Sequence, residues 1–193
     1  MVVQEKAYQE YHELLEKVHS RIMSIKIDMN NATLRKKWGR AIAAYDCLDD
    51  AIDAILEFDI LGEKTYRARR PILYYYGILQ AFSIQIDALK QLYQFFYGNQ
   101  KVKLKRNKVN VADIRNDIVH SSNKIGKESC FIAKSNNMDI GSLNYGIYGE
   151  DNSFTENNIN LRDICLTQVQ SICDAMKDFM SVPNDQIFFI KNL

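Results

Sequence analysis

Four long segments of this chain repeat apolar residues at steps of three and four, and this helical period limits what the chain can fold into. The segments cover residues 2–28, 33–60, 71–97 and 161–181. Wound as an α-helix, each segment gathers its apolar residues on one face, and that face must be buried against another element. Only two prolines and eight glycines interrupt the 193 residues. The pattern therefore predicts a mainly α protein built as a helical bundle.

The segment at 71–97 is the most apolar of the four. Its predicted inward face includes Leu73, Tyr76 and Leu79, but further apolar residues such as Tyr75 and Ile78 fall on other faces. A helix that is apolar on several faces is expected to be buried on several sides. We therefore expect this helix to be central and to contact a second subunit.

In residues 128–160, apolar residues no longer repeat at helical spacing. Two β-like runs, ESCFIAK and SLNYGIYG, are joined by the polar turn SNNMDIG. They predict a small hairpin or flap inserted before the last helix. Leu61-Gly62 is expected to end the second helix, and QIFFIKNL to form a short strand or a docked tail. With a short helix at 110–121, the expected fold is one domain over 1–193, a bundle of about five helices with a β-hairpin insertion.

The composition narrows the class of protein. A hydrophobic content of 47% is enough for one core. The four cysteines form no CxxC pair, which indicates buried, reduced thiols. The N-terminus carries acids, unlike a signal peptide, and the apolar run PILYYYGILQAF is too short to span a bilayer. We expect a soluble cytoplasmic protein without membrane contact.

Charge is unevenly distributed along the chain. The formal charge is −3 over residues 1–60, +9 over 61–127 and −5 over 128–193, counted from the sequence, and these values sum to the net +1. Basic surfaces attract polyanions. The predicted RNA-binding residues lie in and after the run KVKLKRNK: Lys101, Lys103, Lys105, Arg106, Lys108 and Lys124. A solvated loop is the alternative interpretation of this run.

The segment NVADIRNDIVHSSN follows the basic run directly. Asn110 is a good N-cap, so the segment is expected to form a short helix. Arg115 is followed by Asn116 and, five positions after itself, by His120. Arginine binds phosphate through a planar fork, and histidine can move protons near neutral pH. These residue types suit work on a phosphodiester. The alternative is a structural histidine at a helix end beside a surface arginine.

Acidic residues gather on the outer face of the second predicted helix. They are Asp46, Asp49, Asp50, Asp53 and Glu57. A metal site is one interpretation, but carboxylates on one helix need a converging partner to form a coordination sphere. We interpret this face as solvated or salt-bridged, and we expect no metal site.

The order of helices and the motif Arg115-Asn116-x3-His120 resemble the HEPN superfamily, whose name stands for higher eukaryotes and prokaryotes nucleotide-binding. The resemblance rests on the sequence IRNDIVH, about seven residues of the chain. The resemblance implies a metal-independent endoribonuclease of a defence or toxin–antitoxin system, without a cofactor. It implies RNA as substrate, a homodimer with a composite site, and an antitoxin or partner defence protein.

The same resemblance implies roles for the motif residues. Arg115 would bind the scissile phosphate, and His120 would act as general acid or base during attack by the ribose 2′-hydroxyl. Asn116 would orient His120 or contact RNA. One toxin branch of the family has tyrosine two residues after the histidine, where this chain has Ser122. Two alternatives remain open: a non-catalytic HEPN-like module that binds RNA or nucleotides or acts as a scaffold, and an unrelated helical interaction protein.

Overall fold

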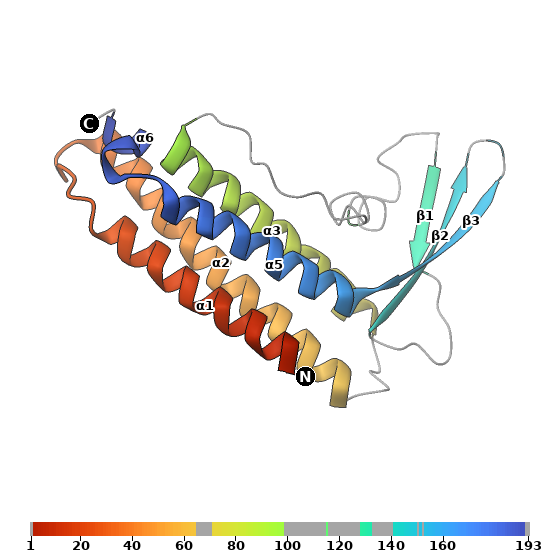
Figure 1. The fold of residues 1–193 in the computed structure, drawn as a ribbon. Coiled ribbons are helices and arrows are strands. Elements are labelled where there is room, and N and C mark those ends of the chain that lie inside the picture. Colours follow the sequence, from red (N-terminus) through yellow and green to blue (C-terminus); the bar gives the residue numbers. More distant parts are fainter. Residues whose placement is uncertain are drawn as a thin grey trace. The chain divides into compact units, whose positions relative to one another are not determined.

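The computed structural model describes residues 2–64, 71–98, 115, 128–132, 141–149, 151 and 153–191, and within these it is mainly helical (Figure 1). The long helices are α1 (Val2–Met23), α2 (Ala32–Lys64), α3 (Pro71–Tyr97) and α5 (Leu161–Ser181). The strands are β1 (Glu128–Ile132), β2 (Ser142–Gly149) and β3 (Phe154–Asn160). A 3-10 turn, η1 (Asn184–Gln186), and the short helix α6 (Phe188–Lys191) follow α5. The prediction of a mainly α protein is confirmed.

The chain divides into two compact units. Unit 1 comprises Met1–Ile52, Ile84–Lys105 and Leu166–Leu193, and unit 2 comprises Asp53–Ser83 and Arg106–Cys165. Helices α2, α3 and α5 therefore contribute residues to both units. The prediction of one domain over the whole chain stays a prediction.

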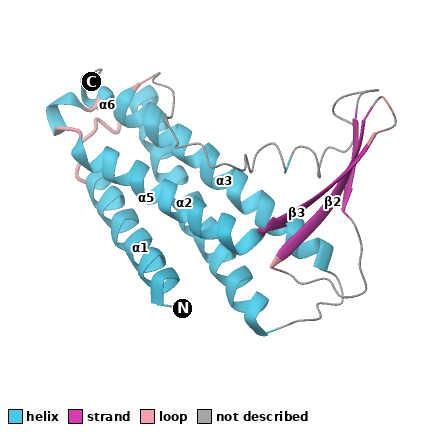
Figure 2. Cartoon of the chain, turned by 45° about the vertical axis from the view of Figure 1, so that its right-hand side comes forward, coloured by secondary structure: helices cyan, strands magenta, loops and turns pink. Residues whose placement is uncertain are grey.

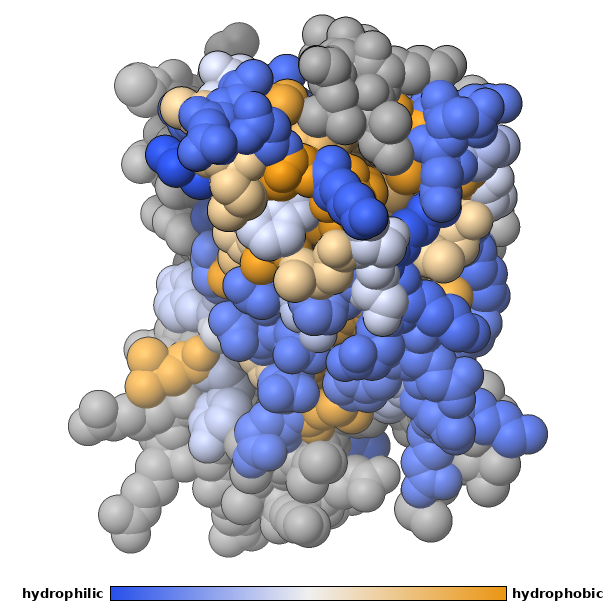
Figure 3. Space-filling model, turned by 90° about the vertical axis from the view of Figure 1, so that its left-hand side faces the viewer, coloured by the Kyte–Doolittle hydropathy of each residue, from blue (hydrophilic) through white to orange (hydrophobic). Residues whose placement is uncertain are grey.

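Unit 1 is a bundle of helices whose apolar faces meet in a core. The side chains of Tyr11, Leu48, Phe96 and Phe179 are fully buried, one from each of α1, α2, α3 and α5. The rings of Phe96 and Phe179 stack with centroids 5.2 Å apart. Burial of such side chains stabilises a fold by roughly 1.5–3 kcal/mol each. In the face seen in Figure 3, hydrophilic side chains cover most of the described surface and apolar ones show between them.

Unit 2 carries a three-stranded antiparallel sheet (Figure 2), and its strands follow the order β1-β2-β3 (Figure 1). In the register, Phe131 lies opposite Gly146, and Tyr145 lies opposite Asn157. The hydroxyl of the buried residue Tyr75, on α3, donates to the carbonyl of Ser142 at 3.0 Å. This bond joins the first residue of β2 to the helix.

The hairpin predicted at 128–160 is present as β1 and β2, but the sequence prediction lacked β3. The segment Phe154–Asn160 contains Asn157, Asn158 and Asn160, and asparagine is depleted in strands. Pairing with β2 over seven positions compensates for this low propensity. The strand therefore depends on a partner that a local pattern does not reveal.

Two helix ends differ from the prediction. Helix α1 ends at Met23 rather than near residue 28, and the Asn31 side chain accepts hydrogen bonds from the backbone N–H of Thr33 and Leu34, both at 3.1 Å. This is an N-cap for α2. The predicted stop at Leu61-Gly62 is wrong, because α2 continues to Lys64. A helical glycine costs only about 1 kcal/mol, which is too little to end a helix by itself.

The inward face of α3 also differs near its start. Leu73 is 61% exposed and Tyr76 is 38% exposed, whereas Tyr75 and Ile78 are buried. Periodicity cannot choose between faces when apolar residues occupy all of them. The bond from Tyr75 to Ser142 accompanies the burial of the other face.

Of the five predicted helices, four are α1, α2, α3 and α5, and the fifth, at 110–121, lies outside the described residues except for Arg115, whose backbone is helical. In the C-terminal segment, the docked tail is the alternative that fits. Ile187 and Phe189 are buried, and α6 replaces the possible strand.

Candidate functional site

Arg115 is the one motif residue that the structure describes. Its side chain is half-buried, and its Nη2 atom donates a hydrogen bond to the Oε1 atom of Gln80 at 3.2 Å. Gln80 is an exposed residue of α3, so the contact joins the motif arginine to the helix within unit 2. A guanidinium carries five N–H donors in a planar fork, and the amide of Gln80 orients that fork through one of them.

The other predicted site residues lie outside the described residues. They are Asn116 and His120 of the motif, and the basic residues Lys101, Lys103, Lys105, Arg106, Lys108 and Lys124. Their proposed roles stay predictions.

Gln80 is a site residue that the sequence analysis missed. It interrupts the most apolar segment of the chain, and the same segment contains Gln85. For Gln85 this position indicates a specific partner, because burying an unpaired amide costs free energy, whereas Gln80 is exposed and gives no such signal. Gln85 is fully buried, and its Nε2 atom donates to the Tyr11 hydroxyl at 3.4 Å.

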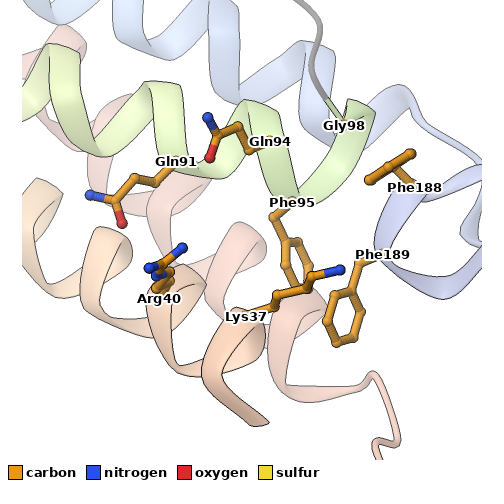
Figure 4. A pocket seen from close by; sticks show the side chains of 8 residues that line it. All are labelled: Lys37, Arg40, Gln91, Gln94, Phe95, Gly98, Phe188 and Phe189. Atoms are coloured by element: carbon orange, nitrogen blue, oxygen red, sulfur yellow. The ribbon is translucent and has the colours of Figure 1, made fainter. Parts of the chain in front are cut away.

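Unit 1 contains a pocket of about 580 Å³ between α2, α3 and α6 (Figure 4). Lys37 and Arg40 line it from α2, and Gln91 and Gln94 line it from α3. The remaining lining residues are Phe95, Gly98, Phe188 and Phe189. Two cations, two amides and three aromatic rings therefore face one space.

The aromatic part of this pocket is built by close packing. Phe95 and Phe189 are buried and stack with ring centroids 4.7 Å apart. Phe188 remains 42% exposed. Gly98 has a φ of 75°, and a Cβ atom there would lie 2.8 Å from the Phe188 ring. Glycine therefore permits both the turn after α3 and the approach of the ring.

The sequence by itself did not indicate this pocket. Its cations belong to the run RKKWGR, which lies in the acidic first third of the chain and is hidden when charge is summed over 60 residues. Phe188 and Phe189 come from the opposite end of the chain, and Phe95 comes from its middle. Helical spacing could have shown that Lys37 and Arg40 share a face, because they are three residues apart.

The acidic face of α2 is exposed at Asp46, Asp50, Asp53 and Glu57, and half-buried at Asp49. Among the residues that the structure describes, three or more His, Cys, Asp or Glu side chains do not converge on any point where they could hold a metal ion.

The cysteines differ in exposure. Cys165 and Cys173 are buried, and burial raises the pKa of Cys173 to about 12. Cys47 is exposed, so the prediction of a buried thiol is wrong at this position. It follows Asp46 on the acidic side of α2, where helical position rather than residue type decides burial.

No helix in the described part of the chain is both long enough and apolar enough to cross a membrane. Searches of protein-family models, curated proteins and solved structures found no match to this chain.

Proposed function

We propose that this protein is a metal-independent endoribonuclease of the HEPN type, acting in a defence or toxin–antitoxin system. The observation that carries the proposal is the state of Arg115. It has a helical backbone, as the motif requires, and its guanidinium is held by Gln80 at 3.2 Å. An arginine that is oriented before substrate arrives can stabilise charge without reorganising.

In the proposed reaction, the ribose 2′-hydroxyl attacks the adjacent phosphorus in line. His120 serves as general acid or base, which contributes roughly 10²–10⁴-fold. Arg115 binds the phosphate and stabilises its developing charge, and Asn116 orients His120 or contacts RNA. The products are a 2′,3′-cyclic phosphate and a 5′-hydroxyl. Because the 2′-hydroxyl is the nucleophile, DNA is not a substrate.

The basic residues from Lys101 to Lys108, together with Lys124, bind the RNA backbone in this proposal. Two copies of the chain form a homodimer in which the two motifs compose one site. An antitoxin or partner defence protein restrains the enzyme. Localisation in the cytoplasm belongs to the same proposal.

The test is cleavage of a mixed RNA pool in EDTA, with the product ends mapped. We expect cyclic-phosphate ends from the wild type and at least about a hundredfold loss of rate in His120→Ala and Arg115→Ala. His12→Ala and Arg35→Ala are matched controls, because both side chains lie in unit 1 on α1 and α2. Gln80→Ala should lower the rate less than Arg115→Ala, since Gln80 positions the arginine without touching the phosphate.

Equal cleavage by the wild type and both motif variants would contradict the proposal. RNA binding without cleavage would instead support the non-catalytic HEPN-like module. Cleavage that stops in EDTA and returns with Mg²⁺ would contradict the metal-independent mechanism.

A further inference from the structure

Cationic, amide and aromatic side chains line the same space in the pocket between α2, α3 and α6. Arg40 and Gln91 lie at one side of the view in Figure 4, and Phe188 and Gly98 lie at the other. Its volume of about 580 Å³ falls within the range of about 300–1,000 Å³ that is usual for small-molecule sites.

The two cations indicate an anionic ligand. Lys37 and Arg40 are exposed, and no ion pair or hydrogen bond with another described residue involves either side chain. The acidic residues of α2 come later along the helix, and none of them lines the pocket. Arginine can bind phosphate with two parallel hydrogen bonds, and lysine adds a point charge.

The rings indicate that the ligand also has a flat aromatic part. Phe95 and Phe189 are buried, and their rings stack on each other in the lining of the pocket. Phe188 is 42% exposed, lines the pocket and lies close against Gly98. Every base has a π-face, so any of the four bases can stack on such a ring.

The two glutamines separate a nucleotide from simpler aromatic phosphates. A phosphate needs only donors, whereas Gln91 and Gln94 each offer a carbonyl oxygen as an acceptor as well as an amide donor. The hydroxyls of a ribose and the edge of a base supply donors and acceptors for such groups. The residue types at the pocket therefore match the three parts of a nucleotide.

We propose that this pocket binds a ribonucleoside monophosphate, with the phosphate at Lys37 and Arg40 and the base on Phe188. The nucleotide can be free, or it can be the 5′-phosphorylated end of an RNA strand. The proposal goes beyond RNA cleavage and does not rest on it, because none of its residues belongs to the motif.

The test is calorimetric titration of the full chain with the four ribonucleoside 5′-monophosphates. Adenosine, which lacks the phosphate, and ribose 5-phosphate, which lacks the base, are titrated separately. We expect at least one monophosphate to bind at least about tenfold more tightly than both adenosine and ribose 5-phosphate. The double variant Lys37→Gln/Arg40→Gln should weaken this binding by about tenfold or more. Lys36→Gln is the matched control, because Lys36 is an exposed lysine of α2 that does not line the pocket.

Phe188→Leu removes the stacking surface and should weaken the monophosphate but leave ribose 5-phosphate unchanged. A 5′-phosphorylated RNA that binds more tightly than both the same RNA with a 5′-hydroxyl and the mononucleotide would identify the strand end as the source. A mononucleotide that binds at least as tightly as the RNA would identify the free nucleotide.

Absence of binding by all four monophosphates at about 1 mM would overturn the proposal, as would equal binding by the double variant and the wild type. Binding by His120→Ala should match the wild type. A failed cleavage experiment therefore leaves this inference standing, and a failed titration leaves the ribonuclease proposal standing. The single tryptophan of the chain, Trp38, adjoins Lys37 and offers fluorescence as a second readout.

Discussion

The hydroxyl of Tyr11 ties three helices of unit 1 together. It donates to the carbonyl of Leu48 at 2.9 Å and accepts a hydrogen bond from Gln85. The side chain is fully buried, and burial raises its pKa above the ordinary value of 10.0. The phenol therefore stays neutral in the folded state at pH values where an unfolded tyrosine ionises.

This raised pKa makes stability depend on alkaline pH. The contribution of Tyr11 is fully present below the unfolded pKa of 10.0 and is lost as pH rises towards the folded pKa. In Tyr11→Phe, we expect the free energy of unfolding to fall by about 1 kcal/mol near pH 8, from the lost hydrogen bond. Between about pH 10 and 11, the free energy of unfolding of the wild type should fall more steeply with pH than that of Tyr11→Phe. The two slopes should differ by up to about 1.4 kcal/mol per pH unit.

Urea unfolding at a series of pH values measures both effects. Tyr45, Tyr93 and Tyr97 also have raised pKa values, but they are present in both proteins and cancel in the comparison. Parallel curves for wild type and Tyr11→Phe would show that Tyr11 titrates normally.

Among the helices, the end of α5 is held by the last turn of α1. The guanidinium of Arg21 donates to the carbonyls of Phe179 and Val182, and to Asn184 Oδ1 at 3.1 Å. Its Cζ atom lies 5.4 Å from the centroid of the Phe96 ring. The last carbonyls of a helix lack partners within the helix and attract a positive charge.

Replacing this arginine should destabilise unit 1. We expect Arg21→Met to lower the free energy of unfolding by about 2–3 kcal/mol, because it removes the guanidinium donors to the carbonyls of Phe179 and Val182. Arg21→Lys should recover only part of this, because an ammonium cannot reproduce the planar fork. Lys17→Met, one turn earlier on α1 and exposed, is the control and should change stability little. Equal stabilities for Arg21→Met and Lys17→Met in urea unfolding would contradict the role of Arg21.

The end of α3 depends on a glycine. Gly98 has a φ of 75°, where side chains are strained, and a Cβ would meet the Phe188 ring at 2.8 Å. Gly98→Ala should therefore lower the free energy of unfolding by about 1–3 kcal/mol. Gly39→Ala, inside α2 with no atom within 4 Å of a Cβ, should raise it by about 0.5–1 kcal/mol. Thermal or urea unfolding compares the two, and changes of the same sign would refute the argument.

At the scale of the whole molecule, charge is the property that the sequence reveals most directly. The third at 61–127 carries +9 while its neighbours are negative, so association with a polyanion should depend steeply on salt. The proposed ribonuclease would bind RNA through the lysines of this third, whatever the sequence of the RNA.

The salt dependence of RNA affinity tests this. Changing Lys101, Lys103 and Lys105 to Gln should reduce the slope of log K against log salt by about 2, since each single-strand phosphate contact contributes about 0.7. The control removes the same charge from exposed lysines of the acidic third, namely Lys6, Lys17 and Lys26. Equal slopes in the two triple variants would show that binding responds to net charge alone.

Parts of this fold could be predicted because they depend on neighbouring residues. Helices α3 and α5 occupy the predicted ranges 71–97 and 161–181, because proline and glycine limit α3 and Asn160 accepts a hydrogen bond from the backbone N–H of Arg162 ahead of α5. The apolar residues that repeat at steps of three and four in α1, from Tyr8 to Ile22, are buried, as the helical period predicts. Of the candidate site, the structure describes Arg115 alone, and its backbone is helical.

The tertiary structure decided what depends on contacts between distant residues. Strand β3 exists because β2 pairs with it, and the buried face of α3 includes Tyr75 because its hydroxyl reaches Ser142. The partner of Arg115 is Gln80, 35 positions away, and the pocket joins Lys37 to Phe188. Local periodicity and capping are encoded within a few residues, so the sequence by itself determined the four long helices, apart from the ends of α1 and α2. Pairing across tens of residues is selected by packing and hydrogen bonding in the folded chain.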